Sequence, residues 1–315
     1  MLTRRLLLSS ALALLPLSAL AAERLKVVAS FSILGDMVAQ VGGDRIALTT
    51  LVGPDGDAHV YQPTPAAARA VAAADLVIVN GLGFEGWIER LIEASAFTGP
   101  VTVASEGIDV LETADDHDEA HGEGHAHDHD HDHDHGHDHG DVDPHAWQSV
   151  PAARVYVANI ADALIAADPA SADAYAASRD AYLKELAALE AEIAAAVAAL
   201  PPERRVVVTS HDAFGYFARD TGLEFLAPQG VSTEAEASAQ DVAALITQIR
   251  ERAIPAIFVE TIADPRLLQQ IERETDARIG GALYSDALSG PDGPAPTYLD
   301  MMRHNLRMLT EALSG

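Results

Sequence analysis

The sequence predicts an α/β fold of two lobes, each with a mainly parallel sheet flanked by helices. Apolar, strand-like runs alternate with helical segments in both halves of the chain, which is the βαβ pattern of a parallel sheet. Between the halves, residues 169–200 form a long alanine-rich segment with no internal glycine or proline. The length of 315 residues suffices for two domains. One large α/β domain is the alternative.

In the N-terminal half, strands are expected at residues 25–30, 46–52, 76–79 and 101–104. A helix should follow Gly35, and others should span residues 65–74 and 87–94. Thr64 and Pro65 are favourable capping and first-turn residues for the second of these helices. We assign residues 23–165 to the N-terminal lobe.

The long helix at 169–200 should end at Pro201 and Pro202, so we assign residues 166–200 to a rigid linking helix and 201–315 to the C-terminal lobe. The strand and helix pattern then resumes. Strands are expected at 206–209, 223–226, 256–259 and 277–279. Helices are expected at 213–221, 239–252, 265–275 and from Thr297 onward.

Residues 1–22 have the pattern of a secretory signal peptide. Arg4 and Arg5 precede an apolar stretch at 6–17, and cleavage is expected near Ala21 or Ala22. A twin-arginine signal and an N-terminal membrane anchor are the alternatives. No cysteine follows the cleavage site, so we expect no lipid anchor of the bacterial lipoprotein kind. The mature chain should be free in the compartment to which it is exported.

The composition restricts both partners and ligands. With 48 acidic and 20 basic residues, the net charge of -28 repels nucleic acid and anionic lipid and attracts cations. The chain has no cysteine, so a metal site could use only imidazole and carboxylate as strong ligands.

A histidine-rich tract crosses residues 117–139, inside a segment at 112–143 that we expect to be a disordered loop. Neutral imidazoles bind zinc, copper and nickel, and the interleaved carboxylates add negative charge. Such a tract should bind several ions weakly, although a solvated linker is the alternative reading. Its ten histidines are His117, His121, His125, His127, His129, His131, His133, His135, His137 and His139.

Four histidines lie outside the tract, and three of them follow predicted strands. His59, His145 and His211 fall at the edge where doubly wound sheets bind ligands. Trp147, close to His145, could shield the site from water. His304 lies within the last predicted helix, and we interpret it as structural or surface.

A fourth ligand should be a carboxylate, because no other histidine is well placed. Asp286 follows the strand-like segment near 279–283, and Glu260 ends another strand. Both are candidates for the fourth ligand on position alone. Asp212 could instead orient an imidazole from behind.

These motifs together resemble the zinc- and manganese-specific solute-binding proteins of ABC importers, over essentially the whole mature chain. The resemblance implies two α/β lobes joined by a long rigid helix, with one metal ion in the cleft between them. The matching motifs are Asp57-Ala58-His59, Gly81-Leu82-Gly83-Phe84-Glu85, Asp143-Pro144-His145-Ala146-Trp147, Ser210-His211-Asp212-Ala213-Phe214-Gly215-Tyr216 and Gly230-Val231-Ser232-Thr233-Glu234-Ala235-Glu236.

Carried over from the family, the ligands are His59 and His145 from the N-terminal lobe, with His211 and Asp286 from the C-terminal lobe. The resemblance thus makes Glu260 the less favoured fourth ligand. Manganese-binding relatives have glutamate in place of His211, and three imidazoles with one carboxylate suit zinc better. Zinc-specific relatives often carry a histidine-acidic loop before the second ligand. Some have a cysteine pair that this chain lacks, so it looks closer to the subgroup that uses the aspartate.

The resemblance implies a protein that captures Zn²⁺ in the periplasm and delivers it to an ABC permease in the inner membrane, with the histidine-rich loop aiding acquisition. We expect a monomer, with a periplasmic zinc metallochaperone as a further partner in some of the subgroup. We expect no enzyme, because the His-Glu-x-x-His helix of zinc hydrolases is missing. The alternatives are a periplasmic zinc buffer or adhesin, and a manganese-specific binding protein.

Overall fold

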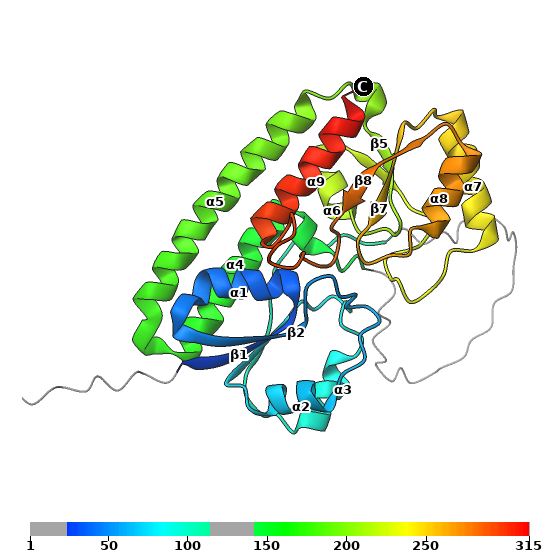
Figure 1. The fold of residues 1–315 in the computed structure, drawn as a ribbon. Helices are drawn as coiled ribbons and strands as arrows, with labels where there is room; N and C mark the ends of the chain where they lie inside the picture. Colours follow the sequence, from blue (N-terminus) through cyan, green and yellow to red (C-terminus); the bar gives the residue numbers. More distant parts are fainter. Residues whose placement is uncertain (1–23, 114–141, 315) are drawn as a thin grey trace, which may run out of the picture.

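The protein consists of two α/β lobes beside one long helix (Figure 1). The structure is a computed structural model, and it describes residues 24–113 and 142–314. The predicted signal peptide and the ten histidines of the tract therefore lie outside the described residues. Glu112 and Val142, which precede and follow the tract in the sequence, pair in an isolated antiparallel bridge.

The N-terminal lobe is built on a parallel sheet with the strand order β2-β1-β3-β4. Its strands are β1 (Leu25–Phe31), β2 (Ile46–Val52), β3 (Leu76–Val79) and β4 (Val101–Val103). Helix α1 (Ser32–Gly42) covers one face, and α2 (Pro65–Ala72) and α3 (Ile88–Ser95) pack together on the other (Figure 1). Because β2 and β3 lie on opposite sides of β1, the carboxyl edge between them is a switch point where ligands bind.

The C-terminal lobe repeats this topology with the order β6-β5-β7-β8, again all parallel. Its strands are β5 (Val206–Val208), β6 (Glu224–Leu226), β7 (Ala256–Glu260) and β8 (Arg278–Leu283). Its helices are α6 (Gly215–Thr221), α7 (Ala239–Glu251) and α8 (Arg266–Glu274). The last strand is longer than the predicted segment 277–279. The carboxyl edges of the two sheets face the same interlobe region.

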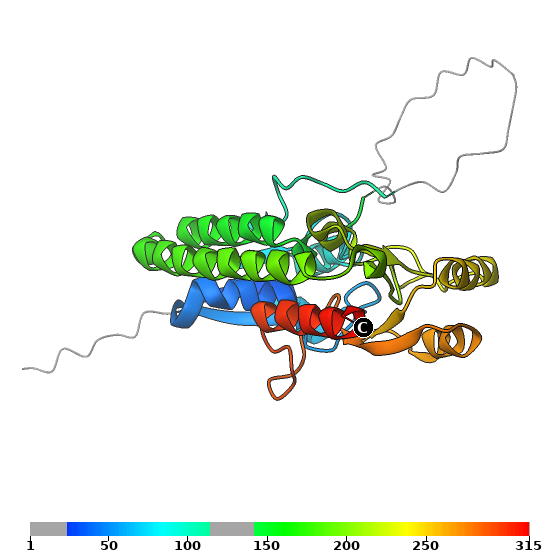
Figure 2. The ribbon, with the colours of Figure 1, turned by 90° about the horizontal axis from the view of Figure 1, so that it is seen from above.

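Two long helices join the lobes. Helix α4 (Val150–Ala167) and the 27-residue α5 (Ala172–Ala198) form a pair that turns at Asp168, and α9 (Tyr298–Leu313) packs on α5 (Figures 1 and 2). Among the described helices, α4 is long and apolar enough to cross a membrane, but it packs against α1 and α5 as a core helix. Short 3-10 turns lie at Gly43–Arg45, Ala146–Gln148, Pro169–Ser171 and Pro202–Arg204.

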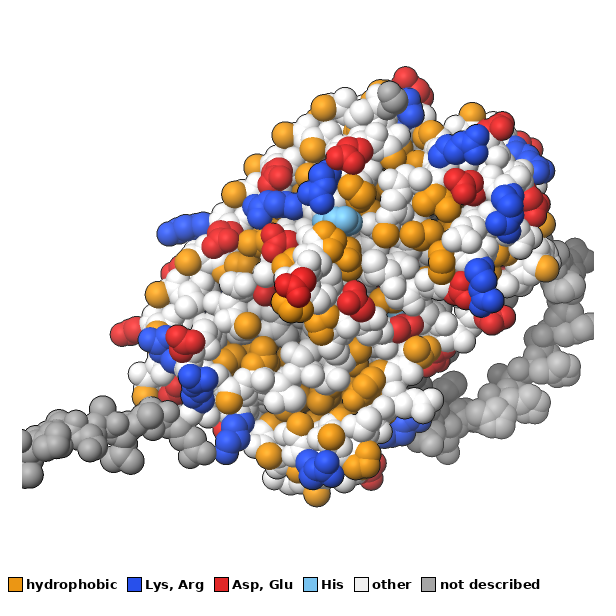
Figure 3. All heavy atoms as spheres, in the orientation of Figure 1, with side chains coloured by type: hydrophobic (Ala, Val, Ile, Leu, Met, Phe, Trp, Pro, Cys, Tyr) orange, Lys and Arg blue, Asp and Glu red, His pale blue; other side chains and the backbone are white. Residues whose placement is uncertain are grey.

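One hydrophobic core runs through the N-terminal lobe, α4, α5, α9 and the inner side of the C-terminal lobe. A smaller core lies between β5, β7, α7 and α8. The predicted fold class is therefore confirmed. On the face in Figure 3, acidic and basic side chains are mixed over both lobes. Part of the net charge of -28 comes from residues 114–141, which hold eleven of the 48 acidic residues and no lysine or arginine.

Candidate metal centre

Four side chains that are far apart in the sequence meet between the lobes. His59, His145, His211 and Asp286 each offer one ligand atom, and these atoms all lie within 4.8 Å of one another. His59 follows β2, His211 follows β5 and Asp286 follows β8, while His145 directly precedes a 3-10 turn. All four are buried, and only His59 retains measurable exposure, at 6%. The structure thus brings together the residues that the sequence singled out.

The distances within this cluster fit a small tetrahedron. Nε2 of His59 and Nε2 of His211 lie 3.3 and 3.2 Å from Asp286 Oδ2, and Nε2 of His145 lies 3.6 Å from Oδ1. Nε2 of His59 and Nε2 of His145 are 3.3 Å apart. An ion about 2.0–2.1 Å from four tetrahedral ligands would separate them by about 3.3–3.4 Å. Three of these four separations are close to the spacing of zinc ligands, and the fourth, to Oδ1 of Asp286, is slightly longer.

Two of the imidazoles have a carboxylate behind them. Nδ1 of His145 lies 2.8 Å from Asp143 Oδ1, and Nδ1 of His211 lies 2.7 Å from Glu260 Oε2. The second contact is short but too bent for a standard hydrogen bond, so we treat it as a charge contact. A carboxylate at Nδ1 leaves Nε2 free to bind metal and fixes the ring.

Glu260, the less favoured fourth ligand in the sequence analysis, lies behind His211. Its Oε1 accepts hydrogen bonds from the backbone N–H groups of Ser210 and His211, at 2.7 and 2.9 Å. This geometry ties the histidine loop to the end of β7. Asp212, which was considered as a residue that orients an imidazole, is exposed, and the carboxylate that faces Nδ1 of His211 is Glu260.

A buried polar network positions the segment before His145. Asn80 Nδ2 donates to the carbonyl of Pro144 at 3.0 Å, and Tyr156 donates to Asn80 Oδ1 at 2.7 Å. Glu85 accepts hydrogen bonds from Ser30 Oγ and from the backbone N–H of Asn80, and burial raises the pKa of its carboxyl. The network links the carboxyl ends of β1 and β3 to the metal-site loop.

Aromatic rings close the site on the N-terminal side. Phe84 packs edge-on against His59, with ring centroids 4.7 Å apart, and Trp147 packs against His145 at 5.3 Å. Trp147 is fully buried, as a residue that excludes water from the site must be. Water exclusion strengthens charge interactions within the cluster.

The electrostatics of the cluster favour a bound cation. Burial lowers the pKa of His211, but Glu260 and Asp286 outweigh it and hold that pKa well above its usual value. Burial raises the pKa of Asp286, yet His211 and His145 hold it well below its usual value. Both carboxylate oxygens of Asp286 and Nε2 of His211 have no hydrogen-bond partner among the described residues. A divalent cation would satisfy all three atoms.

The sequence analysis did not assign Asp143, Asn80 or Glu85 a role at this site. The role of Asp143 could have been predicted from its position two residues before His145. The other two sit in the turn that follows β3, but only the fold brings them to Pro144. His304 is structural, since it is buried and its Nε2 lies 3.0 Å from the carbonyl of Ala282.

Comparison with known proteins gives the family. Residues 27–312 match the family described as ZnuA, zinc-uptake complex component A periplasmic. The chain belongs to this family. Its members are periplasmic metal-binding components of ABC transporters, which are solute-binding proteins and not enzymes, and they act with permease and ATPase components.

The relatives carry names with different metals. The manganese-binding lipoprotein MntA of Halalkalibacterium halodurans is 33% identical over 292 residues, 93% of this chain and 89% of that protein. The iron-binding protein YfeA of Yersinia pestis is 34% identical over 281 residues, 89% of this chain and 84% of that protein. The solved periplasmic zinc-binding protein TroA from Treponema pallidum has a TM-score of 0.81 and 30% identity, with coverage of 93% of this chain and 100% of that chain.

Proposed function

We propose that this protein captures Zn²⁺ in the periplasm and delivers it to an ABC permease, with His59, His145, His211 and Asp286 as the ligands. The observation that carries the proposal is the spacing of 3.2–3.6 Å between Asp286 and the three imidazoles, which suits a tetrahedral zinc ion. Four protein ligands leave no open position for a water nucleophile. A catalytic zinc ion keeps such a position open, so the arrangement favours binding and transport over catalysis.

The donor set supports zinc over harder cations. Three imidazoles and one carboxylate suit zinc, whereas manganese prefers more oxygen ligands. The carboxylates of Asp143 and Glu260 behind two of the rings increase the basicity of Nε2. The donor set and the carboxylates behind the rings are both properties of this chain, so this support for zinc does not depend on the names of its relatives.

The ten histidines of the tract form the second part of the proposal. We infer that they gather zinc, or receive it from a periplasmic metallochaperone, and so raise the supply of zinc to the main site. Weak and rapidly exchanging binding is what a histidine-aspartate sequence supports. A periplasmic zinc buffer is the rival reading, and it would require the tract but not His145.

Manganese is the second candidate cargo, since relatives with about a third of their residues identical are named for manganese or iron. A competition titration of the metal-free mature protein with Zn²⁺, Mn²⁺ and Fe²⁺ decides between them. We expect one tight zinc equivalent that excess Mn²⁺ does not displace. Displacement of zinc by equimolar Mn²⁺ would overturn the zinc assignment and leave the solute-binding role in place.

A further inference from the structure

We propose that Trp147 and Gln148 are positioning residues that hold Asp286 to the N-terminal lobe. As a consequence, His59, His145 and Asp286 stay together when the lobes separate, and His211 is the ligand that leaves. This inference rests on the proposed function, since it concerns the order in which that site loses its ligands.

The carbonyl of Ser285, next to Asp286, is the centre of this arrangement. It accepts hydrogen bonds from Trp147 Nε1 at 2.8 Å and from Gln148 Nε2 at 2.7 Å. All of these groups are buried, and the two donors lie two and three residues after His145 in the chain. The neighbours of one ligand are thus bonded to the neighbour of another, which fixes His145 and Asp286 relative to each other.

The rest of the segment after Ser285 is also bonded to the N-terminal lobe, although it emerges from β8 of the C-terminal sheet. Its further hydrogen bonds are Leu288 N to Ser32 Oγ at 2.9 Å, Asp55 N to the Leu288 carbonyl at 2.9 Å, Tyr298 N to Asp36 Oδ2 at 2.8 Å and Tyr298 Oη to the Trp147 carbonyl at 2.7 Å. The segment crosses between the lobes at Tyr284, whose backbone is bonded to Asn305 of α9.

The segment that carries His211 is bonded differently. Among the described residues, the backbone hydrogen bonds of Thr209, Ser210 and His211 lie inside the C-terminal lobe. Thr209 donates to the Leu226 carbonyl at 2.9 Å, and Ser210 and His211 donate to Glu260. A motion of the C-terminal sheet therefore carries His211 with it, whereas Asp286 remains bonded to the other lobe.

Most of the contacts that would have to break lie on the α6 side of the seam, and one more joins Thr233 Oγ1, in the loop after β6, to Asp57 Oδ2 at 2.7 Å. Ser149 Oγ donates to Asp220 Oδ2 at 2.5 Å, Arg219 donates to the carbonyl of Asp109 at 3.0 Å, and the buried Tyr216 donates to that of Asp143 at 3.0 Å. Arg219 and Asp220 are exposed.

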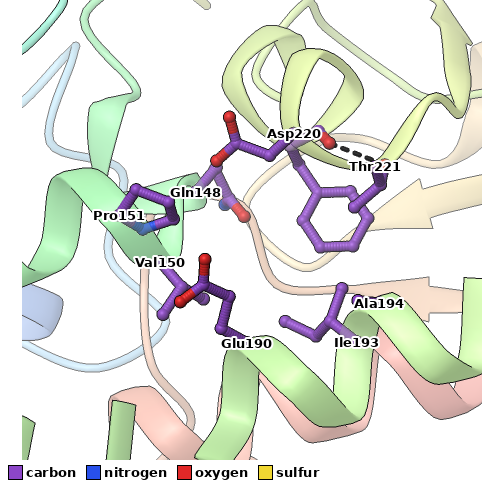
Figure 4. Close-up of a pocket in the computed structure, with 9 residues that line it drawn as sticks. Gln148, Val150, Pro151, Glu190, Ile193, Ala194, Asp220 and Thr221 are labelled. Carbon is purple, nitrogen blue, oxygen red and sulfur yellow. Dashed lines mark hydrogen bonds between the residues drawn. The ribbon is translucent and has the colours of Figure 1, made fainter. Parts of the chain in front are cut away.

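A cavity of about 230 Å³ also lies on this side, between α4, α5 and α6. Gln148 reaches its wall, with Asp220 and Thr221 on one side and Glu190 and Ile193 on the other (Figure 4). Packing is thus incomplete on the α6 side, whereas Ser285 and its two donors are buried. The α6 side is where the lobes can separate at lower cost.

Crystal structures of the wild-type chain with zinc and without metal test the inference directly. The Asp286–His145 distance should stay within about 1 Å of its zinc-bound value. A shift of about this size is usual for the backbone between free and bound structures of one protein. The Asp286–His211 distance should increase by more. An Asp286 that moves away from His145 together with His211 would overturn the inference.

Removal of the two donors provides the second test. In a Trp147→Phe, Gln148→Leu double variant, zinc should dissociate about tenfold faster or more, the usual effect of losing a partner that supports a metal ligand. The visible spectrum of bound Co²⁺ should also change, because Asp286 is no longer held in place. The single variant Gln148→Leu keeps the Trp147 donor. It replaces the double variant in the same measurements if the double variant does not fold.

Asn159→Leu is the matched control, because Asn159 also donates its amide to two backbone carbonyls, of Ala104 and Glu106, away from the cluster. It should leave zinc dissociation and the Co²⁺ spectrum unchanged. If the double variant folds and matches the wild type, the positioning role is wrong. If the wild type itself binds no tight metal ion, the proposed function fails instead.

Discussion

The loops that carry His211 and Asp286 both follow strands of the C-terminal sheet, yet they are held by different lobes. The His211 loop is bonded to Glu260 at the end of β7. The Asp286 loop is bonded through Ser285 to Trp147 and Gln148 beside His145. Position in the sequence therefore divides the four ligands two and two between the lobes, whereas the grouping that we propose from the Ser285 hydrogen bonds divides them three and one.

Removal of single ligands should give the largest losses of zinc affinity. The size of each loss should show which of the two groupings of the ligands is correct. One quarter of the about 10–16 kcal/mol that structural zinc sites provide is about 3 kcal/mol, or roughly a hundredfold in affinity. His145→Ala should lose at least that much, because it breaks the group of three. His211→Ala should still bind one zinc ion, with a smaller loss, and a water should replace the imidazole. Equal losses in calorimetric titrations would favour the division by sequence.

The carboxylates behind the two imidazoles should differ in their response to an amide. In Glu260, Oε1 accepts the loop N–H groups and Oε2 faces Nδ1 of His211, so Gln must place an N–H against one of them. Asp143 uses the same Oδ1 for the backbone N–H and for Nδ1 of His145, and Asn can keep that oxygen in place.

Glu260→Gln should therefore lower zinc affinity by about 10- to 100-fold, the usual range for such partners, and Asp143→Asn by much less. Competition titration with a chromogenic zinc chelator measures both. A larger loss in Asp143→Asn than in Glu260→Gln would show that the contact geometry at Nδ1 is not what orients the rings.

The positions of the ligands could be predicted from the sequence because imidazoles and an aspartate follow strands, and the carboxyl ends of parallel strands share an edge. The strand pattern alone could not choose between Asp286 and Glu260, since each lies at or shortly after the end of a strand, and only the family resemblance favoured Asp286. Only the direction of each side chain places Asp286 in the cluster and Glu260 behind His211.

Helix α4 was not anticipated as an element of its own, because its alanine-rich sequence continues into that of α5 with only a turn at Asp168. The strand pattern was easier to predict, since buried parallel strands such as 76–79 are short, continuous apolar runs. The long-range bonds to Ser285 have no local sequence signal. The boundaries of the signal peptide and of the domains stay predictions.

The raised pKa of His211 predicts that stability and zinc affinity depend on pH. Because that pKa is raised in the metal-free fold, the ion pair with Glu260 and Asp286 stabilises the metal-free protein fully below about pH 6.5, the unfolded value. This stability is lost as the pH rises through the raised pKa.

Zinc requires the neutral imidazole, so its affinity should rise with pH, by up to about tenfold per unit while one proton is displaced. Titration in buffers of different ionisation enthalpy should show proton release at neutral pH. His211→Ala should release fewer protons, and an unchanged release in that variant would contradict the assignment of the proton to His211.

Deletion of residues 117–139 should have the smallest effect on the main site. The tract lies outside the four-residue cluster, so the tight equivalent should keep its affinity within about twofold, which is under 0.5 kcal/mol. Only weaker equivalents should disappear in the titration. A loss of the tight equivalent in this variant, together with its survival in His145→Ala, would mean that the tract is the main site.

The zinc K-edge absorption spectrum of the variant lacking 117–139 tests the central claim most directly, because it removes the ten other imidazoles. We expect four ligands, three imidazole nitrogens and one carboxylate oxygen, at about 2.0–2.1 Å. A spectrum with fewer than three imidazoles, or with six mainly oxygen ligands, would contradict a zinc ion held between His59, His145, His211 and Asp286.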